Sequence, residues 1–184
     1  MGKNRHGTKK EIDNLGQKYN FFTSHIPPYK QKNVIVSSSI IKKIISSGEV
    51  HNISNFLNRN FELSGKIIKG FSRGKQLGYP TANIEIHQDI IKPKNGIYAT
   101  FSNINGKKYF SSTSIGIAPT FKEKKYSIET YIMDFKENIY SQNITVEFIE
   151  KLRDEIKFQS TNDLKNQIQL DVEKSREILN NSQD

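Results

Sequence analysis

The sequence predicts a mainly β protein, in which a closed β-barrel is preceded by helices and followed by one C-terminal helix. Beyond Phe61, short strand-like segments alternate with Gly, Pro and Asn, which is typical of strands joined by turns. Asn105-Gly106 lies between two of these segments and favours a tight hairpin. Residues 161–180 instead carry apolar side chains at helical spacing. Because closure removes the exposed edges of closely spaced strands, a barrel is favoured over an open sheet.

Helices joined by a loop are predicted before the barrel. Thr8-Lys9-Lys10-Glu11 has the form of a capping box, so a helix is expected to begin there. Pro27-Pro28 excludes a helix interior from the next segment. Between residues 37 and 47 the isoleucines form an apolar stripe that ends at Gly48, a typical C-terminal cap. Residues 50–57 predict one more short helix.

The change from helical to strand-like spacing near residues 58–62 marks a domain boundary. It divides the chain into an N-terminal part, residues 1–59, and a β domain, residues 60–184. Within the β domain we expect strands at residues 63–69, 96–101, 108–117, 126–135 and 143–152.

Composition limits the class of protein. At 184 residues with 34% hydrophobic side chains, the chain can hold one domain, or one domain and a fragment of another. The absence of cysteine excludes disulfides, thiolate metal sites and cysteine nucleophiles, and four scattered histidines lack the spacing of a transition-metal site. Because no apolar run approaches the ~18 residues that span a bilayer, and none follows the basic N-terminus, we expect a cytoplasmic protein without a membrane partner.

The net charge of +9 is compatible with a polyanionic ligand, which includes nucleic acids and phosphorylated small molecules. The lysines are spread from Lys3 to Lys174, so a general compositional bias is favoured over a binding stripe. A basic β-barrel that binds single-stranded nucleic acid through exposed aromatic side chains is one alternative function. We expect no nucleic-acid partner, because the motifs below are not needed by such a barrel.

Residues 70–83 are the most informative stretch. Their glycines and basic side chains offer backbone N–H groups and positive charge to a polyphosphate; these are Gly70, Arg73, Gly74, Lys75 and Gly78. A P-loop is excluded, because the spacing is short and Gln76 stands where Ser or Thr would hold magnesium. Without further context, an ordinary connection between barrel strands explains the stretch equally well.

The end of this stretch, Gly78-Tyr79-Pro80-Thr81-Ala82-Asn83, resembles the riboflavin kinase family, whose hallmark is a Pro-Thr-Ala-Asn element after such a loop. Further segments that resemble the family follow in order at residues 96–98, 114–121, 127–135, 139–140 and 152–158. The resemblance therefore extends over most of the β domain.

The resemblance implies a six-stranded, Greek-key-like barrel with a C-terminal helix, which binds Mg²⁺, ATP and riboflavin on neighbouring loops. The ATP- and phosphate-binding residues that it implies are Gly70, Arg73, Gly74, Lys75, Gly78, Pro80, Thr81 and Asn83. Thr81 and Asn83 also match the family's magnesium ligands, and their hard oxygens suit that metal. Glu129 matches the catalytic carboxylate, which takes the proton from the ribityl hydroxyl. From the residues alone, Thr81 and Asn83 could cap a turn, and Glu129 could be a solvent-facing strand residue.

Flavin contact is implied for Arg153, Glu155 and Phe158, which lie in the last of the matching segments. Two plainer interpretations stay open for this segment. Arg153 and Glu155 could form a surface ion pair, and Phe158 could belong to the hydrophobic core.

The chain departs from the family pattern in three places. Phe71 and Ser72 stand where the phosphate loop often has a further Gly and an acidic residue. Tyr131 replaces a common His two places after Glu129, and Ser141 replaces a Gly that often follows the Ile-Tyr pair. A degenerate module that binds flavin or nucleotide without turnover is therefore a further alternative.

The N-terminal part resembles the end of the FMN adenylyltransferase domain that precedes this kinase in bacterial bifunctional FAD synthetases. Residues 2–7 are similar to its basic glycine segment, and residues 36–42 to its Ser-Ser-Thr-x-Ile-Arg element, with Ser39 for Thr and Lys42 for Arg. The earlier half of that domain, with its His-x-Gly-His motif, is missing. The resemblance implies that residues 1–59 are a truncated remnant without adenylyltransferase activity, which a partner chain would complete.

Overall fold

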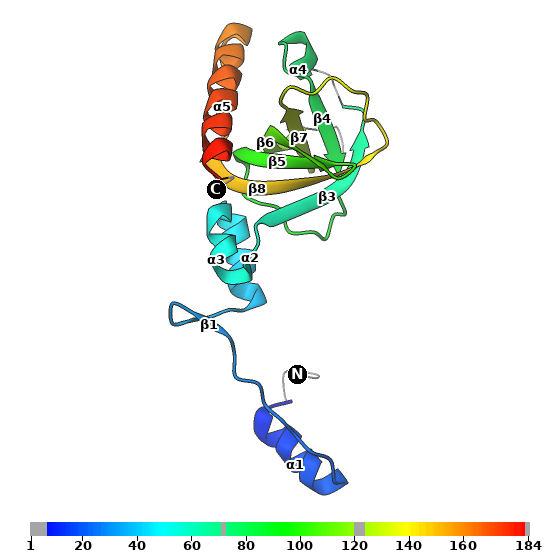
Figure 1. Cartoon of the computed structure of the whole chain (residues 1–184), viewed down its shortest axis with the longest axis vertical. Helices are drawn as coiled ribbons and strands as arrows, with labels where there is room; N and C mark the ends of the chain where they lie inside the picture. The colour runs from blue at the N-terminus through cyan, green and yellow to red at the C-terminus, as the bar shows by residue number, and fades with distance from the viewer. Residues whose placement is uncertain (1–6, 71–72, 120–123, 183–184) are drawn as a thin grey trace. The chain divides into compact units, whose positions relative to one another are not determined.

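The computed structural model describes residues 7–70, 73–119 and 124–182, and the chain divides into two compact units, Met1–Val36 and Ser37–Asp184 (Figure 1). Most of the glycine segment at residues 2–7 lies outside the described residues, as do Phe71 and Ser72. In the part of the chain that is described, none of the helices is long and apolar enough to cross a lipid bilayer.

The first unit holds helix α1 (Lys9–Tyr19) and a hairpin of two short strands, β1 (Lys30–Gln31) and β2 (Val34–Ile35). The predicted capping box begins α1. The Thr8 hydroxyl accepts a hydrogen bond from the Glu11 N–H at 3.3 Å, and the Glu11 carboxylate accepts one from the Thr8 N–H at 2.8 Å. The sequence pattern does not predict the hairpin.

Large apolar side chains of this unit are exposed. Among residues 7–36, Gly16 alone is buried. The exposed apolar residues are Leu15, Tyr19, Phe21, Phe22, Ile26, Tyr29, Val34 and Ile35. The described residues of the first unit therefore form no hydrophobic core of their own.

The second unit begins with three short helices, α2 (Ser38–Ser47), η2 (Val50–Asn52) and α3 (Ile53–Leu57). The Ser37 hydroxyl caps the first turn of α2, where it accepts a hydrogen bond from the Ile40 N–H at 3.4 Å. Gly48 ends α2 with a φ of 85°, a left-handed conformation that glycine adopts without strain. The predicted helix stop is confirmed.

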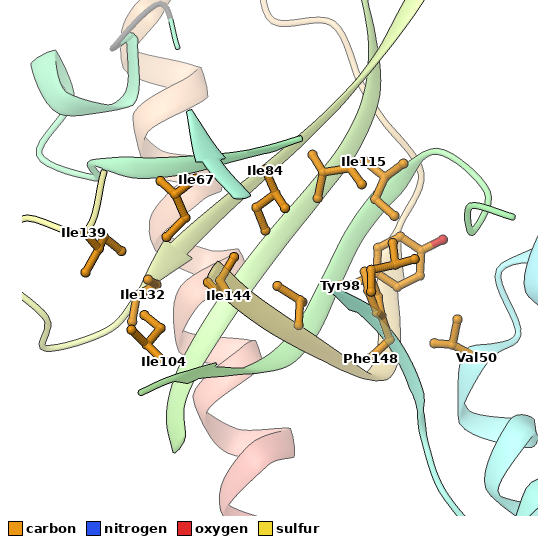
Figure 2. Packing of buried hydrophobic residues seen from close by; sticks show 13 residues of the cluster. Val50, Ile67, Ile84, Tyr98, Ile104, Ile115, Ile132, Ile139, Ile144 and Phe148 are labelled. Carbon is orange, nitrogen blue, oxygen red and sulfur yellow. The ribbon is translucent and has the colours of Figure 1, made fainter. Parts of the chain in front are cut away.

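The short helix η2 packs against strand β8 of the barrel. Val50 and Ile53 are fully buried, and Val50 belongs to the same core cluster as Tyr98 and Phe148 (Figure 2). The segment that precedes the first barrel strand is therefore part of the barrel's hydrophobic core.

We expect Ile53→Ala to lower the free energy of unfolding of the second unit by about 3 kcal/mol, because it leaves a cavity where a fully buried side chain was. Leu57→Ala on the same helix is the matched control, since Leu57 is 39% exposed, and it is expected to cost less than about 1 kcal/mol. Urea unfolding followed by circular dichroism measures both. Equal costs would contradict the burial of Ile53.

Six strands form the barrel: β3 (Phe61–Ile68), β4 (Thr81–Glu85), β5 (Gly96–Ile104), β6 (Lys107–Pro119), β7 (Lys124–Ile132) and β8 (Asn143–Arg153). They pair antiparallel in the order β3-β4-β7-β6-β5-β8, and β8 closes on β3. Because β5, β6 and β7 pair in sequence order and β8 returns beside β5, the arrangement is a Greek key. The predicted six-stranded, Greek-key-like barrel is confirmed.

The predicted hairpin at Asn105-Gly106 is also confirmed. Both residues have positive φ, 50° and 79°, as a type I′ turn requires. The turn joins β5 to β6, which pair over their whole facing lengths from Gly96 with Ile115 to Ile104 with Lys107.

Alternate residues of each strand point into or out of the barrel. The interior cluster consists of Val50, Leu63, Ile67, Ile84, Tyr98, Ile104, Ile115, Ile128, Ile132, Ile139, Ile144, Val146 and Phe148 (Figure 2). On the outside, helix α5 (Thr161–Asn181) lies along the barrel (Figure 1), where Leu179 packs on Ala99 and Phe101. The predicted C-terminal helix is confirmed.

A line of buried hydroxyl groups crosses β5, β6 and β7 inside the barrel. Its five members, here called the hydroxyl seam, are Thr100, Ser102, Ser111, Thr113 and Thr130, all fully buried. Thr100 bonds Ser111 and Thr113 at 2.8 Å each, and Thr113 bonds Thr130 at 3.0 Å. Since Ser102 also donates to Ser111, every hydroxyl of the seam has a partner.

Candidate active site

Strands β4 and β7 bring together the residues that the sequence assigns to the metal and to the base. Asn83 lies directly opposite Glu129, and Thr81 lies two residues away on the same face of β4. The Thr81 hydroxyl donates a hydrogen bond to the Glu129 Oε2 at 3.2 Å. Because Thr130, the neighbour of Glu129, points into the barrel, this constellation lies on the outer face of the sheet.

A second hydroxyl contacts the same carboxylate. Ser127 precedes Glu129 by two residues on β7 and donates to its Oε1 at 3.0 Å. Both carboxylate oxygens of Glu129 therefore accept a hydroxyl hydrogen bond. Sequence reasoning missed Ser127, although the period-two alternation of a strand puts residues 127 and 129 on one face.

The glycine-rich stretch contacts this constellation at its beginning. Gly70 follows β3, and a Cβ at Gly70 would overlap the Asn83 side-chain amide. The absence of a side chain at Gly70 therefore lets Asn83 turn toward the loop.

The rest of the stretch forms a single helical turn, α4 (Arg73–Gln76), followed by a left-handed residue, Gly78, with φ 89°. A Cβ at Gly74 would overlap the Tyr79 carbonyl oxygen, so the loop closes tightly on itself. Lys75 is exposed, as a side chain that meets a soluble polyanion must be.

A cavity of about 260 Å³ opens beside Thr81. Its lining comes from β3, β4, β7 and the loop between β7 and β8: Ile67, Pro80, Thr81, Ala82, Thr130, Ile132, Phe135, Lys136, Glu137, Asn138, Ile139 and Tyr140. Apolar side chains form much of the wall, and charged and amide groups of the loop supply polar contacts. Apolar walls with a few polar groups are typical of small-molecule sites.

Two tyrosines form an aromatic pair at the edge of the site. The rings of Tyr79 and Tyr131 meet edge to face, with centroids 5.3 Å apart, and Tyr131 pairs with Thr81 across the strands. Burial raises the pKa of the Tyr131 hydroxyl, and the nearby Asp134 carboxylate raises it further. Tyr131, which stands where the family commonly has His, therefore keeps its proton at neutral pH.

Arg153 is held by helix α5. Its Nε and Nη2 donate to the two oxygens of Asp171 at 2.8 and 2.5 Å, and Asp171 is buried. Gln167 donates to the same carboxylate, and the Arg153 Nη1 donates to the Asp154 carbonyl oxygen at 3.0 Å. The ion-pair partner of Arg153 is thus Asp171, and the guanidinium ties the end of β8 to α5.

Glu155 lies on the same outer face of the sheet as Glu129. Its carboxylate accepts a hydrogen bond from the Asn95 side-chain amide at 3.0 Å and occupies the space where Gly116 would carry a Cβ. Gly116 pairs with Ser127 on β7, so Glu155 lies near the β7 row that holds Glu129. Phe158 is half-buried.

Ser141 adopts a φ of 67°, in the left-handed region that favours glycine. Its N–H donates to the Ile67 carbonyl oxygen at 2.9 Å, which holds the turn before β8 against β3. The Gly that the family often has at this position suits that conformation, which Ser141 adopts here.

The donors fit a magnesium ion that shares the oxygens of a nucleotide. The described residues contain no group of three or more His, Cys, Asp or Glu side chains suited to a metal ion. Thr81, Asn83 and Glu129 nonetheless offer hydroxyl, amide and carboxylate oxygens from two adjacent strands. Mg²⁺ prefers such hard oxygens and needs few protein ligands when phosphates supply the others.

Two similar curated proteins are named as bifunctional enzymes. The chain is 36% identical over 184 residues to the bifunctional riboflavin kinase/FMN adenylyltransferase of Buchnera aphidicola subsp. Schizaphis graminum, a match that covers 98% of this chain and 59% of that protein. It is 30% identical over 181 residues to the protein of the same name from Haemophilus influenzae, covering 98% and 58%. The chain therefore spans somewhat over half the length of these relatives.

A solved structure from Streptococcus pneumoniae, titled as a macrolide-efflux protein, matches with a TM-score of 0.81 and 29% identity over 89% of this chain and 54% of that one. The family model for riboflavin kinase matches residues 57–179, which include the barrel strands, the glycine-rich stretch and most of α5. Since this match covers more than half of the chain, the chain belongs to the riboflavin kinase family.

Proposed function

We propose that the chain is a riboflavin kinase, which transfers the γ-phosphate of ATP to the ribityl 5′-hydroxyl of riboflavin. The observation that supports this function best is that Thr81 and Asn83 of β4 lie beside Glu129 of β7. The chain also belongs to the riboflavin kinase family. Phosphoryl transfer needs a base for the attacking hydroxyl and oxygen ligands for a metal-bound nucleotide, and these residues supply both.

Glu129 is the general base in this proposal. Its carboxylate accepts the proton of the ribityl 5′-hydroxyl while that oxygen forms a bond to the γ-phosphorus, and the bond to the β–γ bridging oxygen breaks to release ADP. The hydrogen bonds from Thr81 and Ser127 hold the carboxylate on the outer face of the sheet. The protein thus contributes mainly positioning.

Thr81 and Asn83 are the proposed ligands of Mg²⁺. The Thr81 hydroxyl gives its hydrogen to Glu129, so its lone pairs stay available for a cation. The Asn83 side chain supplies a second oxygen beside it. When bound, the metal neutralises charge on the transferred phosphate.

ATP is proposed to bind along the glycine-rich stretch, with its base in the cavity beside Thr81. Pro80 and Thr81 belong to the cavity wall and also end the stretch, so a single nucleotide can reach both. The phosphate contacts would come from Gly70, Arg73, Gly74, Lys75, Gly78 and Asn83.

Riboflavin is proposed to contact the segment after β8. Glu155 and Phe158 are candidates for direct contact, since Glu155 lies against Gly116 on the strand next to β7. Arg153 would contribute to flavin binding indirectly, because its guanidinium is bound to Asp171. It holds the Asp154 backbone in place through a hydrogen bond to the carbonyl oxygen.

We further propose that residues 1–59 correspond to the end of an FMN adenylyltransferase domain, in a protein that works in the cytoplasm. The relatives match this chain from end to end, which supports the assignment. The exposed apolar side chains of the first unit are suited to a partner chain that completes that domain. Val50 of this part nevertheless packs in the core of the barrel.

The purified 184-residue chain is expected to convert riboflavin to FMN with ATP and Mg²⁺, and to form no FAD. Fluorescence-detected chromatography of the flavins measures both products. A folded chain that binds riboflavin but makes no FMN would favour a flavin-binding module without turnover. A steep salt dependence of oligonucleotide binding, together with no flavin binding, would favour the nucleic-acid alternative.

A further inference from the structure

Ser127 contacts the proposed base without belonging to any of the substrate-binding groups. It lies on β7, half-buried, and its hydroxyl donates to the Glu129 Oε1 at 3.0 Å. A serine hydroxyl carries one hydrogen, so this donation commits it to Glu129. Ser127 lines neither the cavity beside Thr81 nor the glycine-rich stretch.

The carboxylate of Glu129 is held from two sides along β7. On one side, the Thr81 hydroxyl donates to Oε2 at 3.2 Å. Thr81 pairs across the strands with Tyr131, which lies two positions after Glu129 on β7. Ser127 lies two positions before Glu129. The terminal torsion of a glutamate is broad, so two donors fixed on adjacent strands restrict a carboxylate that would otherwise rotate.

The surroundings leave the Ser127 hydroxyl free for this contact. Gly116, its cross-strand partner, has no side chain, and the Glu155 carboxylate occupies that space. Glu155 has a donor of its own in the Asn95 side-chain amide. The hydrogen of Ser127 therefore goes to Glu129.

We propose that Ser127 is a positioning residue for phosphoryl transfer, which keeps the Glu129 carboxylate aimed at the substrate hydroxyl. The proposal rests on the proposed riboflavin kinase function. Because Ser127 acts on the base and not on the bound substrates, its loss lowers kcat and leaves the KM values unchanged.

The test compares Ser127→Ala, Ser127→Thr and the control Ser64→Ala in steady-state FMN formation. Ser127→Ala is expected to lower kcat about tenfold, with both KM values within about twofold of wild type. Ser127→Thr keeps the hydroxyl and is expected to stay within about threefold of the wild-type kcat. Ser64 bonds Thr145 on another pair of barrel strands at 2.8 Å, so Ser64→Ala should leave kcat unchanged.

A double-variant cycle separates positioning from a structural role. In the Glu129→Gln background, Ser127→Ala is expected to cause no further loss of kcat, because the residue acts through Glu129. Ser127→Ala and Ser64→Ala should have the same melting temperature and the same affinity for riboflavin. A general loss of structure in Ser127→Ala would lower both.

Several outcomes would overturn the proposal. These are an unchanged kcat in Ser127→Ala, a Thr variant as slow as the Ala variant, a raised KM for riboflavin at constant kcat, or additive losses in the double variant. If the wild-type chain makes no FMN, the proposed function itself fails, and the proposal for Ser127 falls with it.

Discussion

Glu129→Gln is expected to lower kcat for FMN formation by about 10³-fold, because the side chain keeps its shape but can no longer take a proton. One of the Thr81 and Ser127 hydroxyls can still donate to the amide oxygen of the glutamine, and the other can accept a hydrogen bond from its NH2 group, so the sheet around the site is preserved. ATP binding should change by less than about twofold, since the lost function is proton transfer and not ground-state binding. Steady-state kinetics and calorimetric titration of a non-hydrolysable ATP analogue measure the two effects.

Glu62→Gln is the control for this variant. Glu62 is an exposed strand glutamate on β3, where it pairs with Glu147 of β8, so its loss should leave kcat unchanged. A Glu129→Gln protein that retained more than about a tenth of the wild-type kcat would show that another group acts as the base.

Asp171→Ala is expected to lower the free energy of unfolding by about 3 kcal/mol, because it leaves the Arg153 guanidinium without its partner in a largely dry place. The side chain of Asp171 is 8% exposed and that of Arg153 is 21% exposed. Gln167 loses its acceptor at the same time. Urea unfolding followed by circular dichroism measures the effect.

Lys174→Ala provides the comparison within α5. Lys174 pairs with Glu177 at 2.8 Å on the exposed side of the helix, and such pairs contribute less than about 1 kcal/mol. The double variant Arg153→Met/Asp171→Leu should recover most of the lost stability, since it removes both charges together. If Asp171→Ala cost no more than Lys174→Ala, the ion pair would contribute nothing beyond a surface contact.

Local signals in the sequence were sufficient where neighbouring residues decide the structure. The capping box at Thr8 and Glu11, the glycine after α2 and the Asn105-Gly106 turn each depend on contacts within a few residues, and each is found as predicted. The alternation of apolar residues located five of the six barrel strands. Strand β4 was not located, because it is short and begins at the end of the glycine-rich stretch.

The arrangement of the site could be predicted only in part. The family motif named Thr81, Asn83 and Glu129 separately, but their meeting depends on the pairing of strands that are far apart in the chain. The partner of Arg153 was missed for the same reason, since Asp171 lies one helix later. Ser127 carries no motif of its own, and only the side-chain geometry reveals its contact with Glu129.

The hydroxyl seam inside the barrel constrains which alignment of strands can fold. A shift of β6 by one residue would turn Ser111, Thr113 and the fully buried Ile115 to the outside and bring Ser112, Ser114 and Gly116 into their places, so the existing seam contacts of β6 would be lost together with a large apolar side chain of the core. The same shift between β6 and β7 would change which residues face Glu129. The barrel interior thus favours one register, and the alignment of the strands that carry Thr81, Asn83 and Glu129 is set in part by side chains on the opposite face of the sheet.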